Sequence, residues 1–223
     1  MRRQSEKRRG AEAGFTLIEL MIALGVTLII MVVSSRMLAM SLAVRARENQ
    51  RAEAIADVQR ALQTMSREIS NAGLGMFPVN GTPNNGLVSA DSDSLSIRVR
   101  SNLNAFCGPN AGSCDSDTSD PDEDVAFSLI SNNTGGETQK LITRQDVATG
   151  AISPLANRVD ALTFSYLNAD GTVAATPSAA ARVRMVVTVD LPAIGTPSVA
   201  GYQPATRTRL TSDAVLRNSL LGQ

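Results

Sequence analysis

The side chains of this 223-residue chain that could do chemistry fall into three groups. The first is a single glutamate, Glu19, in an otherwise apolar run from Phe15 to Val33. An ionisable group inside a membrane segment costs about 2.5 to 3.5 kcal/mol on insertion scales, so Glu19 calls for a functional role. The other groups are two cysteines, Cys107 and Cys114, and a run of carboxylates that follows them directly.

The amino-acid composition excludes several kinds of catalytic and metal site. The chain has no histidine and no tryptophan. The lack of histidine excludes imidazole acid–base catalysis, serine–histidine and cysteine–histidine nucleophile pairs, and the commonest zinc ligand. Its 21 basic and 21 acidic residues cancel, so no net charge favours a nucleic-acid partner. We therefore interpret its serines and aspartates as turn and cap residues and expect no enzyme.

The two cysteines enclose a loop rich in turn-forming residues. Six residues separate Cys107 from Cys114, which is the wrong spacing for a Cys-x-x-Cys redox motif. Two cysteines without histidine also make a poor zinc site. If this part of the chain faces an oxidising compartment, the pair predicts a disulfide. Closing so short a loop would stabilise the fold by about 2 to 3 kcal/mol.

The acidic run covers residues 115 to 124. Oxygen ligands in a flexible loop suit calcium, but the glycine and the distal glutamate of an EF-hand loop are missing. Two interpretations stay open: a solvated acidic loop, which the composition favours, and a calcium site as the one cofactor to consider. The carboxylates available to calcium are Asp115, Asp117, Asp120, Asp122 and Asp124.

A membrane-spanning helix is the element that must carry Glu19. Twenty-one positions separate Phe15 from the next charge, Arg36. At 1.5 Å per residue this is about 32 Å, close to the roughly 30 Å hydrocarbon thickness of a bilayer. Five basic and two acidic residues precede the run and mark its cytoplasmic side. A cleaved secretory signal fits poorly because the run is long and carries a carboxylate, whereas a plain single-span anchor fits its hydropathy.

The helical pattern continues past the membrane. Residues 37 to 72 contain neither proline nor glycine. Apolar residues recur there at spacings of three and four, which predicts a helix packed on its own domain, with a coiled coil to a partner as the alternative. Gly73, Gly75 and Pro78 predict its end. The apolar stripe consists of Ile55, Val58, Leu62, Met65, Ile69 and Ala72.

Beyond the helix, the chain predicts a head rich in β-strands. Residues 76 to 92 have the composition of a loop, and 132 to 136 that of a turn. One long helix followed by strands without intervening helices predicts an α+β fold with an antiparallel sheet. The expected strands are 95–100, 125–129, 141–144, 159–167, 172–175, 182–191 and, at an edge, 206–216.

The stretch from Gly14 to Leu20, GFTLIEL, resembles the class III signal of type IV prepilins and type II secretion pseudopilins. The resemblance implies a type IV pilin fold. It also implies that a prepilin peptidase cuts after Gly14 and N-methylates Phe15, leaving 209 residues. Glu19 would be the carboxylate that meets the N-terminal ammonium of a neighbouring subunit during assembly. Positions 15 and 19 are one helical turn apart, so both groups share a helix face.

Weaker matches make the chain most similar to minor pilins of the PilW class. They comprise the helix end at 66–75 and the segments 95–99, 159–166, 183–187 and 216–218. The implied organisation is a leader (1–14, removed), a membrane half of the helix (15–36), a periplasmic half (37–75) and a β-rich head (76–223). The protein would reside in the inner membrane by a single pass and then in a pilus at the cell surface.

The function implied is that of a minor pilin that primes pilus assembly at or near the filament tip. Its partners would be other minor pilins, the major pilin, the assembly platform, the prepilin peptidase and the membrane. A J-type pseudopilin of a type II secretion pseudopilus is the nearest alternative, because it shares the helix and the carboxylate. A single-span anchored binding domain is the alternative from a different class.

Overall fold

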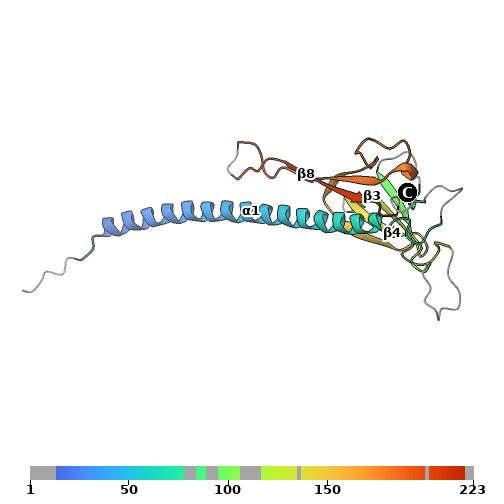
Figure 1. The fold of residues 1–223 in the computed structure, drawn as a ribbon. Coiled ribbons are helices and arrows are strands. Elements are labelled where there is room, and N and C mark those ends of the chain that lie inside the picture. The colour runs from blue at the N-terminus through green and yellow to red at the C-terminus, as the bar shows by residue number, and fades with distance from the viewer. Residues whose placement is uncertain are drawn as a thin grey trace, which may run out of the picture. The chain divides into compact units, whose positions relative to one another are not determined.

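The computed structural model describes residues 14–77, 84–88, 95–105, 117–134, 137–198 and 201–218. Figure 1 shows a long helix followed by strands. In chain order the elements are α1 (Leu17–Ser70), β1 (Leu87–Val88), β2 (Ser96–Arg100), β3 (Asp124–Thr134), β4 (Glu137–Asp146), β5 (Ile152–Ala156), β6 (Val159–Leu167), η1 (Pro177–Ala179), β7 (Arg182–Leu191) and β8 (Thr206–Val215).

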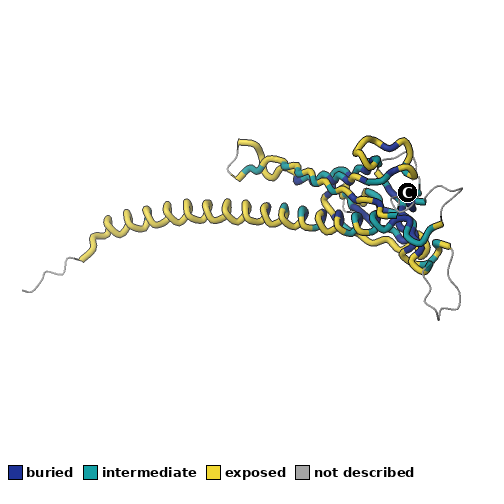
Figure 2. The backbone as a smooth tube through the Cα atoms, viewed as in Figure 1, coloured by how far each residue is buried: buried dark blue, intermediate teal, exposed yellow. Residues whose placement is uncertain are grey.

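The chain divides into two compact units, Met1–Ala46 and Arg47–Gln223. The described part of the first unit is almost wholly helix, and its large apolar side chains are exposed, as the yellow tube of Figure 2 shows. By length and composition α1 can cross a membrane. Side chains that water would penalise so strongly need lipid or protein around them, which agrees with the predicted membrane half.

In the second unit α1 buries one stripe against the head. The predicted stripe is confirmed from Val58 to Ala72, whereas Ile55 is only half-buried and Ala54 faces the core instead. Ala54 and Ala61 are small enough to lie in the contact between the helix and the head. The predicted stripe did not include them because alanine is only weakly hydrophobic. The buried α1 residues are Arg47, Ala54, Val58, Ala61, Leu62, Met65 and Ile69.

The head contains a five-stranded sheet in the order β1-β2-β3-β4-β5 and a three-stranded sheet in the order β6-β7-β8. Every strand pair is antiparallel. Fully buried side chains from both sheets, such as Phe127, Ile142, Leu162 and Met185, complete the core over the helix stripe. The predicted α+β class is confirmed. The head was expected to contain one sheet, but it contains two. The chain passes from the first sheet to the second in the turn between β5 and β6, where Arg158 has a left-handed backbone conformation.

The structure differs from the predicted strands and turns in four places. The segment 172–175 forms only an isolated bridge from Val173 to Leu167, because Val173 is 79% exposed and has no core to face. β5 was missed because its side chains are mostly exposed and it contains Pro154, as an edge strand can. β1 lies within the predicted loop. Asn132 and Asn133, expected in a turn, belong to β3, whose pairing with β4 runs to Thr134 and Glu137.

Three backbone segments meet where α1 ends. The Gly73 amide donates to the Arg100 carbonyl at 2.8 Å, and the Arg100 amide donates to the Gly86 carbonyl at 2.7 Å. Gly86 has a φ of +71°, and a Cβ there would lie 2.1 Å from the Gly73 nitrogen and 2.2 Å from the Arg100 oxygen. Only glycine fits this crossing of the helix end, β1 and β2.

We expect Gly86→Ala to lower the free energy of unfolding by about 2 to 5 kcal/mol, the sum of left-handed strain and overpacking. Gly150→Ala is the matched control, because Gly150 has a φ of +72° with no atom within 4 Å of a built Cβ. It should lose only the strain, about 1 to 2 kcal/mol. Urea unfolding of the full chain in detergent, followed by circular dichroism, compares them. Equal losses would show that the crossing tolerates a side chain.

Candidate functional site

The predicted cleavage site lies just before the helix. Gly14 and Phe15 are exposed and precede α1, which begins at Leu17. No described atom lies within 4 Å of a Cβ built on Gly14, and the Phe15 side chain is 83% exposed. Within the described residues, nothing packs against the bond between them.

Thr16 and Glu19 cap the start of α1 reciprocally. The Glu19 amide donates to the Thr16 hydroxyl at 3.3 Å. The Glu19 carboxylate accepts from the Thr16 amide at 3.4 Å and from the Thr16 hydroxyl at 3.3 Å. This is a capping box, which satisfies amides that a helix start leaves without partners. Thr16 was not among the predicted site residues, although the Thr-x-x-Glu spacing is itself the signal of such a cap.

The cap positions the Glu19 carboxylate without neutralising it. The two hydrogen bonds that the carboxylate accepts are long and come from neutral donors, the amide and the hydroxyl of Thr16. No Lys or Arg of the described residues lies within ion-pair distance of it. A carboxylate in an apolar helix that has only such donors gains strongly from a nearby cation, because low dielectric strengthens the attraction. The arrangement is therefore suited to accept an ammonium group.

The predicted disulfide and part of the predicted calcium set lie outside the described residues. These are Cys107, Cys114 and Asp115. The structure gives the other four carboxylates separate partners. Asp117 accepts from Ser119, Asp120 from Asn104, Asp122 from Arg144, and Asp124 from Arg98 and Arg100. Within the described residues, no group of three or more acidic or cysteine side chains is arranged to hold a metal.

The favoured interpretation of a solvated acidic loop is wrong for its last two residues. Glu123 is 1% exposed and Asp124 is 5% exposed. One Glu123 oxygen accepts from the amides of Leu103 and Asn104 at 2.7 and 3.3 Å, so this carboxylate orders the segment after β2. Composition alone could not separate Glu123 from its exposed neighbours.

Asp124 holds two arginines of β2 at the start of β3. Arg98 donates to both carboxylate oxygens at 2.6 Å, and Arg100 donates to one of them at 2.7 Å. Burial raises the pKa of Asp124, but the hydrogen bonds and charges of the two arginines outweigh it and leave the pKa below its usual value. This is a structural ion-pair cluster that fixes the register of β2 on β3.

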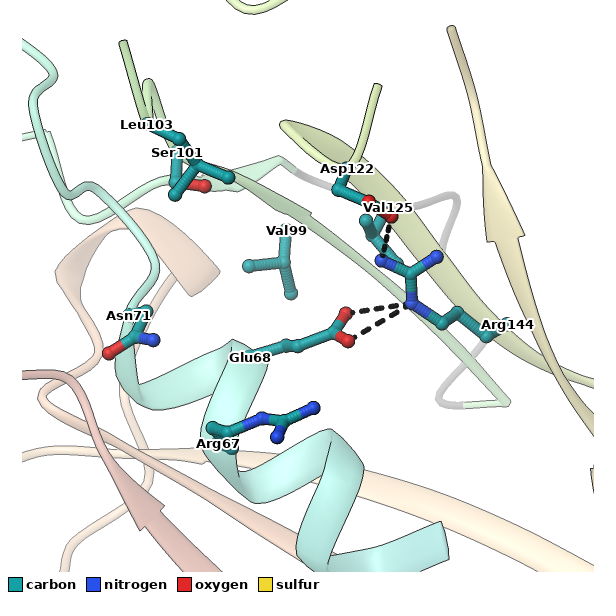
Figure 3. Close-up of a pocket in the computed structure, with 9 residues that line it drawn as sticks. All are labelled: Arg67, Glu68, Asn71, Val99, Ser101, Leu103, Asp122, Val125 and Arg144. Atoms are coloured by element: carbon teal, nitrogen blue, oxygen red, sulfur yellow. Dashed lines mark hydrogen bonds and ion pairs between the residues drawn. The ribbon is translucent and has the colours of Figure 1, made fainter. Parts of the chain in front are cut away.

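A cavity of about 320 Å³ lies beside the last turn of α1 (Figure 3). Arg144 of β4 spans it: its Nε donates to both Glu68 oxygens at 3.0 and 3.1 Å, and an Nη donates to Asp122 at 2.7 Å. Burial lowers the pKa of Arg144, but the hydrogen bonds and charges of Asp122 and Glu68 raise it by more than burial lowers it. The pKa of Arg144 therefore lies above its usual value. Val99 and Val125 supply apolar lining. The arrangement ties the helix to the sheet.

The comparisons with known proteins bear on the N-terminal segment. Residues 9–35 match the family model described as the prokaryotic N-terminal methylation motif. None of the curated proteins matches the chain. The matched residues include Gly14, Phe15 and Glu19, and the match supports a type IV pilin-like prepilin or pseudopilin.

The lowered pKa of Asp124 predicts an acid-sensitive contribution to stability. Because the folded pKa lies below the unfolded value of about 3.9, the contribution is present above that value and is lost as pH falls through the folded pKa. We expect Asp124→Asn to destabilise the head at neutral pH and to differ progressively less from the wild type below pH about 4. Urea unfolding as a function of pH measures this difference.

Asp170→Asn is the control for the loss of one carboxylate. Asp170 is exposed and accepts hydrogen bonds from Thr172 in its own turn. This variant should cost less stability at neutral pH than Asp124→Asn. If Asp124→Asn kept the acid profile of the wild type, the arginine cluster would not contribute as described.

Proposed function

We propose that this protein is a minor pilin of a type IV pilus system that is incorporated at or near the filament tip and primes assembly. The observation that carries the proposal is the N-terminal segment, where Gly14 and Phe15 stand free of packing before a capped carboxylate in an exposed apolar helix. The methylation motif over residues 9–35 supports it. The specific PilW-class assignment rests on the resemblance of the helix end and the strands.

The distribution of apolar surface on α1 supports an assembly role. The stripe from Val58 to Ile69 is used by the head of the same chain, so it is not available to a partner. The apolar side chains from Phe15 to Val44 are left exposed. Lipid can cover them before assembly, and the equivalent helices of other subunits can cover them in a filament.

Glu19 would make the move of α1 from lipid into a filament depend on the right partner subunit. Leaving lipid with an unpaired carboxylate is costly, and an ammonium from a neighbouring subunit would offset much of the cost. After cleavage, the methylated terminus at Phe15 would offer this cation on the same helix face, one turn away. The protein then acts by binding and is itself a substrate of the prepilin peptidase.

The proposed partners are the peptidase, the assembly platform, other minor pilins and the major pilin. The head would lie in the periplasm before the subunit enters a surface pilus. In that oxidising compartment, pairing of Cys107 with Cys114 stays a prediction. Calcium binding by the acidic run also stays a prediction, and no other cofactor is proposed.

A J-type pseudopilin of type II secretion is the second candidate, because the methylation motif fits pilins and pseudopilins alike. Co-purification with sheared pili favours the first candidate, and dependence of protein secretion on this chain favours the second. A single-span anchored binding domain would keep its leader in the mature protein.

Gly14→Val should block cleavage. The structure itself tolerates the new side chain, since no described atom lies near a Cβ at Gly14, so a loss of processing reports recognition by the peptidase. Gly25→Val is the matched control, because Gly25 is equally open and lies within the helix. Intact mass spectrometry of the membrane-extracted protein separates the 223-residue precursor from the 209-residue methylated product. Normal cleavage of Gly14→Val would place the cut elsewhere.

Glu19→Gln separates charge from capping, since glutamine can keep the cap while it removes the charge. We expect both Glu19→Gln and Glu19→Ala to be processed normally but to enter pili at least about tenfold less than the wild type, equivalent to about 1.4 kcal/mol. Immunoblots of sheared pili against whole cells measure this ratio.

Glu53→Gln, at an exposed position in the same helix, is the control and should assemble normally. Full assembly of Glu19→Gln with failure of Glu19→Ala would mean that the cap matters and the charge does not. Normal assembly of both variants would remove Glu19 from the mechanism.

A further inference from the structure

The cavity beside the last turn of α1 contains more polar groups than the attachment of Arg144 uses (Figure 3). Its volume of about 320 Å³ lies at the lower end of the range for small-molecule sites, which is about 300 to 1,000 Å³. All of its lining residues lie between positions 67 and 144, within the second unit. The cavity is therefore a candidate site for a small ligand.

Arg67 brings to the cavity a positive charge that the described structure does not pair. Its side chain is exposed, and no carboxylate of the described residues lies within ion-pair distance of its guanidinium. Figure 3 shows it at the cavity without an ion pair or hydrogen bond to the other lining residues. A cation in the last turn of a helix is favoured by the helix dipole, which explains its place in the sequence but leaves its donors available.

Ser101 adds a buried hydroxyl to the same cavity. The residue directly follows β2 and is only 9% exposed. Its amide donates to the Glu123 carbonyl at 2.9 Å, whereas its hydroxyl has no hydrogen-bond partner in the part of the chain that the structure describes. A buried hydroxyl without a partner costs free energy, and a bound polar group can recover it. Because Ser101 lines the cavity, a ligand there can supply the missing partner.

Arg144 also keeps donors to spare. Its contacts with Glu68 use Nε, and its contact with Asp122 uses one Nη. A guanidinium carries further N–H groups on its second Nη, and these make no hydrogen bond to any described residue. Part of this guanidinium can therefore meet a ligand without releasing either carboxylate.

The charges of the lining favour a ligand with a single negative charge. Two arginines and two carboxylates line the cavity, and their charges cancel. Arg144 pairs with both carboxylates, so Arg67 is the one cation of this lining left to match. A dianion such as phosphate would bring its second charge close to Glu68 and Asp122. A carboxylate carries one charge and matches the planar donors of arginine.

The rest of the lining offers an apolar surface. Val99 and Val125 are buried in the sheet, and Leu103 is half-exposed. These side chains suit a short hydrocarbon group attached to the carboxylate, because burying such a group is favourable in itself. The limited volume excludes a long chain.

We propose that this cavity binds a monocarboxylate that carries a short apolar group. Arg67 is the charge partner, Ser101 donates a hydrogen bond, and Val99 and Val125 contact the apolar group. A small organic acid presents this chemistry, and so does the C-terminal residue of a peptide that ends in an apolar side chain. The inference concerns the head alone and goes beyond the proposed role in a filament, which is tested at Gly14 and Glu19.

Isothermal titration calorimetry on the full chain in a non-ionic detergent tests the proposal. The probes are isocaproate, a free acid, and N-acetyl-leucine, which ends as a peptide does. N-acetyl-leucinamide, which lacks the charge, is the control ligand. We expect at least one acid to bind with a Kd of about 1 mM or lower and the amide to bind at least about tenfold more weakly. Tighter binding of N-acetyl-leucine would indicate a peptide end, and equal or weaker binding would indicate a free acid.

Arg67→Gln should weaken binding of the acids at least about tenfold, because it removes the charge partner and keeps a polar side chain. Ser101→Ala should weaken it about threefold, as the loss of one hydrogen bond does. Arg60→Gln is the matched control, since Arg60 is exposed on the same helix, lies outside the cavity and should leave binding unchanged. Circular dichroism checks that each variant is folded.

Three results would overturn the proposal. The first is that neither acid binds the wild type at about 10 mM, a concentration well above the expected Kd. The second is that the uncharged amide binds as tightly as the acids. The third is that Arg67→Gln binds like the wild type, in which case Arg67 serves only the end of the helix.

Discussion

The burial of the α1 stripe between Ala54 and Ile69 is the contact on which the rest of the described structure depends. It supplies the helix side of the core, and both antiparallel sheets fill the other side with side chains such as Phe127 and Met185. Because this face is occupied by the chain's own head, the helix can present its N-terminal apolar surface to something else. One continuous helix thus serves two environments, and the change between them falls near Arg47, where the second unit begins.

Charges in the head mainly join backbone segments. Asp124 gathers Arg98 and Arg100, Arg144 links Glu68 to Asp122, and the buried Glu123 holds the amides that follow β2. In each case an acidic or basic side chain is met by a partner from another segment, as polar groups in a partly dry interior require. Asp122, Glu123 and Asp124 belong to the acidic run, for which the composition favoured a solvated loop, but the structure gives each of them a structural partner.

Periodic features were predictable from the sequence, and features set by distant backbone were not. The α1 stripe, β6 and β7 follow apolar periods that local sequence displays directly. The membrane run and its glutamate were equally visible. Arg47 resembles any other arginine of an exposed helix, and its burial depends on carbonyls more than 140 residues away. The burial of Glu123 and the existence of β5 could not be predicted for the same reason. Each depends on a segment elsewhere in the chain, the residues after β2 for Glu123 and strand β4 for β5.

Arg47 of α1 holds the connection between β7 and β8 by donating to the carbonyls of Leu191, Pro192 and Pro204. The partners of its guanidinium there are backbone carbonyls, so these contacts include no carboxylate. The contacts that Asp124 makes with β2 behave differently, because they need an ionised carboxylate. Acidification would therefore weaken the contacts that join β2 to β3, because a protonated Asp124 no longer forms ion pairs with Arg98 and Arg100. The head thus joins its segments in two ways, by contacts that need a carboxylate and by contacts, such as those of Arg47, that use only backbone carbonyls.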